Sequence, residues 1–185
     1  MKKEEVISDG SRKGDWFFQL GREALLKKKI NRKIVFFEML EKAIIPDLKS
    51  TDKEGVIKKL VSLLERNGEI LGKEKIVRVI LEREKLGSTG IGQGIAVPHA
   101  KADDVKQIVL AFGLSRKGVN FESLDGEPVY FIFLVLAPIS SIGIHLKVLA
   151  KVARLLKNNA FRNSIRSCKG AKEIFQVIKE EDEKN

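Results

Sequence analysis

The chain has 185 residues, of which 43% are hydrophobic and 32% charged, a balance typical of a globular protein with one core and room for an added segment. Its longest apolar run, residues 129–139, is well short of the about 20 residues that a membrane-spanning helix needs, and its single cysteine excludes an internal disulfide. We therefore expect a cytoplasmic protein that does not insert into membranes.

The first 32 residues are predicted to be a basic N-terminal extension, either helical or disordered. Residues 1–35 hold ten Lys or Arg against five Asp or Glu, so half of the net charge of +10 lies there. No nucleic-acid-binding motif accompanies this charge, and aromatic residues make up only 6% of the chain. We expect a solvated basic tail with no nucleic-acid partner, followed by one domain over residues 33–182 and a short tail over residues 183–185.

Two amphipathic helices are predicted to open this domain. Thr51-Asp52-Lys53-Glu54 has the pattern of a capping box, and Asn67-Gly68 supplies the stop of the helix that follows. The second helix is predicted from about Lys73 to Lys85, so a glycine-rich loop starts at Gly87 after a helix and not after a strand. The inward positions of the two helices are Val56, Ile57, Leu60, Leu63, Leu64, Ile76, Val77, Ile80 and Leu81.

Two strands follow in the second half of the chain. In residues 107–115, apolar residues at even positions alternate with Val109, Ala111 and Gly113, which is typical of a strand. Residues 129–136 form a near-continuous apolar run that ends before Pro138. Such a run predicts a central strand buried on both faces, and therefore helices on both sides of the sheet.

Three helices are predicted to complete the domain. The first runs from about residue 142 to residue 157, and the others cover residues 161–167 and 171–180. In the first of them the predicted inward residues are Leu146, Leu149, Ala153 and Leu156. The order of helices and strands predicts an α/β fold.

The string from Gly87 to Ala100 carries the strongest functional signal. It places His99, one of only two histidines, at the end of a loop that contains the glycines Gly90, Gly92 and Gly94. Glycines allow backbone N–H groups to converge on an anion, and Pro98 restricts the backbone just before the imidazole. We therefore predict a phosphate-binding loop beside a nucleophilic histidine. Ser88 and Thr89 either donate hydroxyl groups to the phosphate or cap the preceding helix.

This string resembles the signature of the enzyme IIA proteins of the phosphoenolpyruvate-dependent sugar phosphotransferase system. The similar class is fructose/mannitol, which includes the nitrogen-regulatory IIA proteins. The resemblance rests on Ala96-Val97-Pro98-His99, on Leu81-Glu82-Arg83-Glu84-Lys85-Leu86 and on Ile144-His145-Leu146, and it runs from about residue 33 to residue 180. It implies a mixed sheet between helical layers.

The resemblance also implies roles for single residues. His99 matches the phosphorylated histidine of the family, whose Nε2 atom carries the phosphoryl group. Arg83 matches an arginine that lies beside the phosphohistidine, and His145 matches a second histidine that supports the first. Taken alone, Arg83 would more simply be a surface charge or an i,i+4 partner, and His145 would more often be a helix cap or an exposed residue. No cofactor or metal ion is implied.

The implied function is that of a phosphotransferase component. His99 would accept a phosphoryl group from phospho-HPr and pass it to an enzyme IIB during sugar uptake. The alternative is a nitrogen-regulatory protein whose phosphorylation state controls protein partners. Gly-Ser-Thr-Gly-Ile-Gly is most similar to the regulatory members, although Gln93 stands where these commonly have Asn.

Other phosphate and metal sites do not fit the residues. The spacing Gly90-x-Gly92-x-Gly94 after a helix is not the Gly-x-Gly-x-x-Gly of a dinucleotide fold, and no Gly-Lys-Ser/Thr of a Walker loop is present. A metal hydrolase needs ligands at close spacing, whereas His99 and His145 lie far apart in the sequence. Asp103-Asp104 is more simply a polar turn before a strand.

Overall fold

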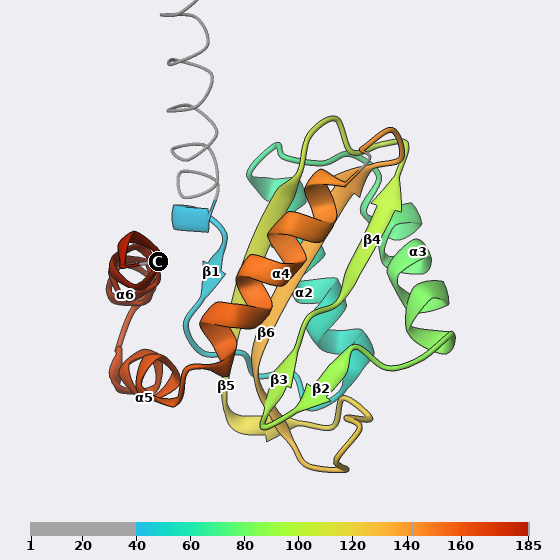
Figure 1. Ribbon diagram of the computed structural model, residues 1–185. Coiled ribbons are helices and arrows are strands. Elements are labelled where there is room, and N and C mark those ends of the chain that lie inside the picture. Colours follow the sequence, from blue (N-terminus) through green and yellow to red (C-terminus); the bar gives the residue numbers. More distant parts are fainter. Residues whose placement is uncertain (1–39, 142, 185) are drawn as a thin grey trace, which may run out of the picture. The chain divides into compact units, whose positions relative to one another are not determined.

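The structure, a computed structural model, describes residues 40–141 and 143–184 (Figure 1). The predicted extension over residues 1–32 lies outside the described residues. The described part contains six strands and five helices: β1 (Ile44–Ile45), α2 (Lys53–Arg66), α3 (Lys73–Lys85), β2 (Gly90–Gly92), β3 (Ile95–Ala96), β4 (His99–Ala102), β5 (Val109–Val119), β6 (Val129–Pro138), α4 (Ile144–Lys157), α5 (Asn159–Ser167) and α6 (Ala171–Glu183).

The strands form one mixed sheet with β6 near its centre. Their order is β1-β5-β6-β3-β2, and β4 also pairs with β6. The long pair β5–β6 is antiparallel, whereas β3 and β4 each run parallel to β6 and β1 runs parallel to β5. The strand that sequence predicts to be central therefore contacts three others, and its parallel partner β4 begins at His99.

Helices cover both faces of this sheet. On one face, α2 and α3 pack on Val109 and Ala111 of β5 and on alternate residues of β6. On the other face, α4, α5 and α6 pack on Phe112 of β5 and Phe133 of β6, whose ring centroids lie 5.7 Å apart. In Figure 1, α4 crosses in front of β6 and α2 lies behind it. The predicted α/β fold with helices on both faces of a mixed sheet is confirmed.

The start of α2 corrects one detail of the prediction. Its N-cap is Asp52 and not Thr51, because the Asp52 carboxylate accepts a hydrogen bond from the Gly55 N–H at 2.8 Å. Glu54 does not close a capping box and forms an i,i+4 ion pair with Lys58 instead. The predicted stop holds, since Asn67 caps the C-terminus and Gly68 has a φ of 75°.

The start of α4 corrects a second detail. The helix begins at Ile144 rather than at residue 142, and Leu146, which was expected to face inward, is 60% exposed. The residues of α4 that the core buries are Val152, Leu155 and Leu156, further along the helix. The first turn of α4 therefore lies at the margin of the core, where one side faces β6 and the other faces solvent.

Candidate functional site

Strand β4 presents two polar side chains on one face. Its burial alternates, with His99 and Lys101 half-buried and Ala100 and Ala102 buried on the opposite face. This alternation follows from the two-residue repeat of a strand. The parallel register with β6 places His99 beside Val135 and Lys101 beside Ala137, which fixes both polar residues over the middle of the sheet.

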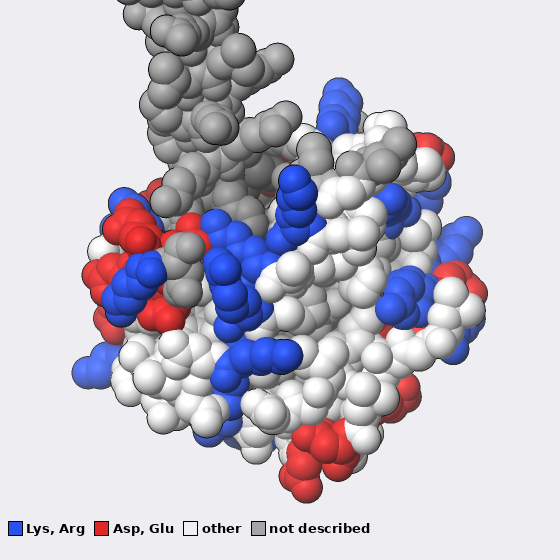
Figure 2. Space-filling view, in the orientation of Figure 1, with Lys and Arg blue, Asp and Glu red and all other residues white. Residues whose placement is uncertain are grey.

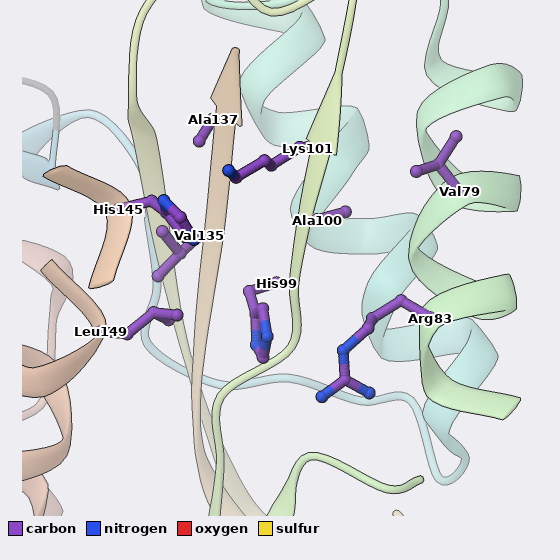
Figure 3. A pocket seen from close by; sticks show the side chains of 9 residues that line it. All are labelled: Val79, Arg83, His99, Ala100, Lys101, Val135, Ala137, His145 and Leu149. Carbon is purple, nitrogen blue, oxygen red and sulfur yellow. The ribbon is translucent and has the colours of Figure 1, made fainter. Parts of the chain in front are cut away.

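Four elements meet around these side chains to form a cavity of about 240 Å³ (Figure 3). Helix α3 contributes Arg83 from one side and α4 contributes His145 from the other. No Asp or Glu is among the lining residues, so the cations there have no carboxylate partner within the cavity. The lining consists of Val79, Arg83, His99, Ala100, Lys101, Val135, Ala137, His145 and Leu149.

The ring of His99 is oriented by its own backbone neighbours. Its Nδ1 lies 2.9 Å from the carbonyl oxygen of Val97. A carbonyl oxygen only accepts hydrogen bonds, so Nδ1 must carry the hydrogen. In the neutral ring the lone pair is then on Nε2. Pro98, which joins the two residues, is held in turn because its carbonyl accepts from the Val135 N–H of β6 at 3.0 Å.

Arg83 lies in the last turn of α3 and extends toward the side of the cavity that holds His99 (Figure 3). One guanidinium nitrogen, Nη1, donates to the carbonyl of Gly87 at 3.0 Å. A guanidinium has five N–H donors in a planar fork, so most of its donors stay available for an anion. The single contact with Gly87 holds the fork at the entrance of the loop that follows α3.

Lys101 and His145 line the far side of the cavity. The Lys101 ammonium extends toward His145 and donates to the Ser141 carbonyl at 3.0 Å, in the loop between β6 and α4 (Figure 3). The Nδ1 atom of His145 is buried and has no hydrogen-bond partner among the described residues. Sequence reasoning missed Lys101, although the alternation His-Ala-Lys-Ala could have placed it beside His99 once these residues were read as a strand.

The glycine-rich segment is a β-hairpin, not an open loop. Strands β2 and β3 pair antiparallel, and the two residues between them, Gln93 and Gly94, have φ angles of 57° and 75°. Two consecutive positive φ values are typical of a type I′ turn. A side chain on Gly94 would have its Cβ 2.8 Å from the ring of Tyr130, so glycine is also required there by space.

Backbone amides of this hairpin already donate hydrogen bonds, most of them to side chains of the β5–β6 connection. The amides of Gly92 and Gln93 donate to the Ser123 hydroxyl at 3.2 Å and to the Asp125 carboxylate at 2.8 Å. The amide of Gly90 donates to Ser88 Oγ at 3.1 Å. The N–H of Gln93, followed by the Ser123 hydroxyl and the Glu127 N–H, holds the pKa of Asp125 below its usual value.

A buried carboxylate fixes the turn between α3 and this hairpin. Glu84 is 5% exposed and accepts hydrogen bonds from both the N–H and the hydroxyl of Thr89. The ammonium of Lys53 lies 3.4 Å from the same carboxylate and 2.7 Å from Glu122. Ser88 donates its hydroxyl to the carbonyl of Phe121 at 3.0 Å. These groups bond to one another rather than to the cavity.

The structure thus separates the predicted site residues into two groups. Arg83, His99 and His145 come together around one cavity. The expected phosphate ligands lie outside its lining, and most of their donors already have partners within the chain. Phosphate binding therefore stays a prediction, one that the cavity geometry does not support, for Ser88, Thr89, Gly90, Gly92 and Gly94.

Two further observations concern the described residues. Across residues 40–141 and 143–184, no three His, Cys, Asp or Glu side chains gather in a way that would hold a metal ion. None of the helices α2 to α6 has the length and apolar character that crossing a membrane requires.

Residues 38–181 match the family described as phosphoenolpyruvate-dependent sugar phosphotransferase system, EIIA 2. The chain belongs to this family. Membership in the EIIA family assigns it to the phosphotransferase components and supports a role as a phosphocarrier. The similarity stated from Ala96-Val97-Pro98-His99 and its neighbouring motifs is therefore confirmed.

Two relatives and two solved structures illustrate the range of the EIIA family. A nitrogen regulatory protein from Bradyrhizobium diazoefficiens is 36% identical over 138 residues, which cover 74% of this chain and 88% of that protein. The fructose-specific EIIABC component of Bacillus subtilis is 36% identical over 146 residues, 78% of this chain but only 23% of that larger protein.

Among solved structures, the nitrogen regulatory protein IIA-Ntr from Neisseria meningitidis superposes with a TM-score of 0.72 at 35% identity, covering 78% of this chain and 99% of that chain. Enzyme IIA mannitol from Escherichia coli, solved in complex with phosphorylated enzyme IIB mannitol, has a TM-score of 0.64 at 21% identity, covering 74% and 94%. At that identity the likeness concerns the fold alone.

Proposed function

We propose that this EIIA protein accepts a phosphoryl group from phospho-HPr on Nε2 of His99 and passes it to an enzyme IIB. The observation that carries the proposal is the hydrogen bond from Nδ1 of His99 to the Val97 carbonyl at 2.9 Å. It assigns the ring hydrogen to Nδ1 and leaves the lone pair of a neutral imidazole on Nε2. Family membership supports the carrier role, and the EIIABC relative supports sugar uptake as its setting.

The transfer step balances with groups that phospho-HPr and this chain supply. The Nε2 lone pair attacks phosphorus, the new N–P bond forms as the N–P bond of the donor breaks, and the donor nitrogen keeps that electron pair. The Nδ1–H stays on its carbonyl partner throughout, so the ring need not turn over to react. Passing the group onward reverses these steps, with Nε2 as the leaving atom.

The cations of the cavity would stabilise the charge that this step moves. The transferring phosphoryl group spreads its charge over three oxygens, so catalysis consists mainly of positioning and electrostatic stabilisation. Arg83 offers a planar fork that matches two oxygens, and Lys101 adds a point charge from the same strand as His99. We assign His145 a supporting role, because its buried Nδ1 has no partner in the described part of the chain.

The two histidines of the chain allow a decisive test of the acceptor. Phosphoenolpyruvate, enzyme I and HPr should give the wild-type protein an acid-labile, base-stable adduct. The matched variants are His99→Ala and His145→Ala, since these are the only histidines present. We expect no label on the first and slower labelling of the second. Stoichiometric label on His99→Ala would refute the assignment. In the phosphorylated wild-type protein, nitrogen-15 NMR of isotope-labelled histidine identifies which ring nitrogen carries phosphorus.

A regulatory role is the second candidate. It is favoured by the match to the nitrogen regulatory relative, of which 88% is covered, and to IIA-Ntr from Neisseria meningitidis, of which 99% is covered. In that case the phosphorylation state of His99 would control binding to other proteins. One measurement distinguishes the two roles, namely the rate at which a fructose- or mannitol-class enzyme IIB discharges the phosphorylated protein. Rapid discharge is expected only of a transport component.

A further inference from the structure

The cavity around His99 is larger than the group that it is proposed to accept. A phosphoryl group has four non-hydrogen atoms, whereas the cavity measures about 240 Å³, the liquid volume of roughly eight water molecules. Much of the wall is apolar and is built by Val79, Val135, Ala137 and Leu149. The cavity therefore has room for a short organic group beside the phosphoryl group.

The two permanent cations of this cavity lie at different places along it. Arg83 extends toward His99, whereas Lys101, two residues further along β4, lines the far side (Figure 3). Two residues of a strand span about 6.6 Å. No Asp or Glu is among the lining residues, so no carboxylate of the lining neutralises either cation. The cavity can therefore hold two anionic groups of one small molecule, one at each cation.

The surroundings of the cavity favour the entry of a small anion. Residues 128–172, which cover β6, α4 and α5, include eight Lys or Arg and no Asp or Glu. Lys and Arg side chains follow α4 on the face shown in Figure 2, while Asp and Glu gather at its lower edge and over α6. A cleft that is bordered by one sign of charge raises the local concentration of ligands of the opposite sign.

We propose that this cavity also takes a phosphoryl group directly from a free acyl phosphate with a short alkyl chain, without a donor protein. The inference rests on the proposed function, because it uses the same nucleophile, Nε2 of His99. In this binding mode the phosphoryl group lies against Arg83 and the carboxyl oxygen faces Lys101. The alkyl chain contacts the apolar wall, to which Leu149 belongs.

The step balances without a further reactant. The Nε2 lone pair attacks phosphorus, an N–P bond forms, and the P–O bond to the acyl group breaks. The carboxylate leaves with the electron pair of that bond and needs no proton, because the ionised form of a carboxylic acid is the stable one near pH 7. A phosphohistidine whose other ring nitrogen carries hydrogen instead leaves as a neutral imidazole. Only the acyl donor therefore forms an anion that Lys101 stabilises as it leaves.

Two other classes of small donor match the cavity less well. A nucleoside triphosphate carries Mg²⁺ between its phosphates, and Mg²⁺ sites in proteins use carboxylates, of which the lining has none. An enol phosphate releases an enolate, which is much more basic than a carboxylate and has to be protonated as the P–O bond breaks. An acyl phosphate requires cations alone, and cations are what the cavity supplies.

Loading by acetyl phosphate, with neither enzyme I nor HPr present, tests the proposal on the full chain. The adduct is measured by intact mass, which distinguishes phosphorylation from acetylation, and His99→Ala identifies its site. Free imidazole under the same conditions gives the unassisted rate, and loading by phospho-HPr is measured in parallel. We expect a rate that saturates with acetyl phosphate and exceeds that of imidazole on the order of a hundredfold.

Lys101→Met tests the contact with the leaving carboxylate, because it removes the charge and keeps the length of the side chain. Lys106→Met is the matched control, since Lys106 is exposed and lies outside the lining. We expect Lys101→Met to slow loading by acetyl phosphate by about tenfold or more, and loading by phospho-HPr by clearly less. The control should match wild type with both donors.

The possible results separate this inference from the proposed function. Loading by phospho-HPr but not by acetyl phosphate would overturn the inference alone, and so would a rate that matches free imidazole and does not saturate. Equal slowing of both donors in Lys101→Met would contradict the carboxylate contact. Loading by phosphoenolpyruvate alone, with acetyl phosphate inactive, would assign the cavity to enol phosphates instead. A wild-type protein that neither phospho-HPr nor acetyl phosphate loads would refute the proposed function itself.

Discussion

Polar groups in the hairpin and in the cavity around His99 differ in how far they are hydrogen-bonded within the chain. In the hairpin, the amides of Gly90, Gly92 and Gln93 all donate to side chains of the same chain. In the cavity, Arg83 uses one donor on a carbonyl, and His145 Nδ1 has no partner in the described structure. Satisfied groups stabilise a fold, whereas unsatisfied ones are available to a ligand. Substitutions in the cavity should therefore affect activity, and those around the hairpin should affect stability.

Among the substitutions that test this comparison, the largest effect is expected from Arg83→Ala. Loss of an oriented charge-assisted contact typically costs about 2–4 kcal/mol in a transition state, on the order of a hundredfold in rate. The melting temperature should hardly change, because within the described residues the side chain makes only one hydrogen bond, to Gly87. Arg78→Ala, on the exposed side of the same helix, is the control for general charge loss. A normal transfer rate in Arg83→Ala would remove this residue from the site.

Glu84→Ala tests the other half of the comparison. The substitution leaves the buried N–H and hydroxyl of Thr89 without their acceptor, which should destabilise the protein by about 1–3 kcal/mol. Denaturant unfolding measures this loss, and transfer by the folded variant should stay close to wild type. Glu82→Ala is the matched control, because Glu82 is exposed and, in the part of the chain that the structure describes, pairs only with Lys85. A large loss of transfer with normal stability would contradict the division between the two regions.

The smallest effect concerns pH and the Asp125 carboxylate. Hydrogen bonds, first of all from the Gln93 N–H, lower the pKa of Asp125 in the folded protein. The ionised form therefore stabilises the hairpin above the ordinary aspartic pKa, and this contribution is lost as pH falls through the lowered value. The amide resonance of Gln93 should shift over that range in an NMR titration. In Asp125→Asn the shift should be absent, and an unchanged titration there would assign it to another group.

The long elements could be predicted because their patterns are strong. The apolar run of β6 and the period of α3 indicated a buried strand and a helix ending at Lys85, and both are present. The short strands β1, β3 and β4 have two to four residues each, which is too few for a pattern to show. They form because the antiparallel pair β5–β6 leaves one backbone edge of each strand free for further pairing. Lys101 was missed for that reason.

The site was predictable in part. Similarity to a family suggested His99, Arg83 and His145 as candidates, and these residues, which lie far apart in the sequence, line one cavity in the fold. The glycines alone could not reveal the hairpin geometry, because a phosphate loop and a tight hairpin require the same residue type. What distinguishes them is the acceptor that each amide finds, and Ser123 and Asp125 lie about thirty residues away in the chain. The period of α4 likewise did not reveal that its first turn extends past the core and exposes Leu146.

The Nδ1 atom of His145, which has no hydrogen-bond partner in the described structure, connects the heat stability of the protein to the supply of phosphoryl groups. A buried polar atom without a hydrogen bond destabilises a protein by about 1–3 kcal/mol. A phosphoryl group on His99 would bring three acceptor oxygens into the cavity that His145 also lines, and a hydrogen bond to this nitrogen would remove that cost. The loaded protein should then melt at a higher temperature than the empty one. Cells short of phosphoryl donor would hold the less durable form, so the lifetime of the protein itself would depend on how often it is charged.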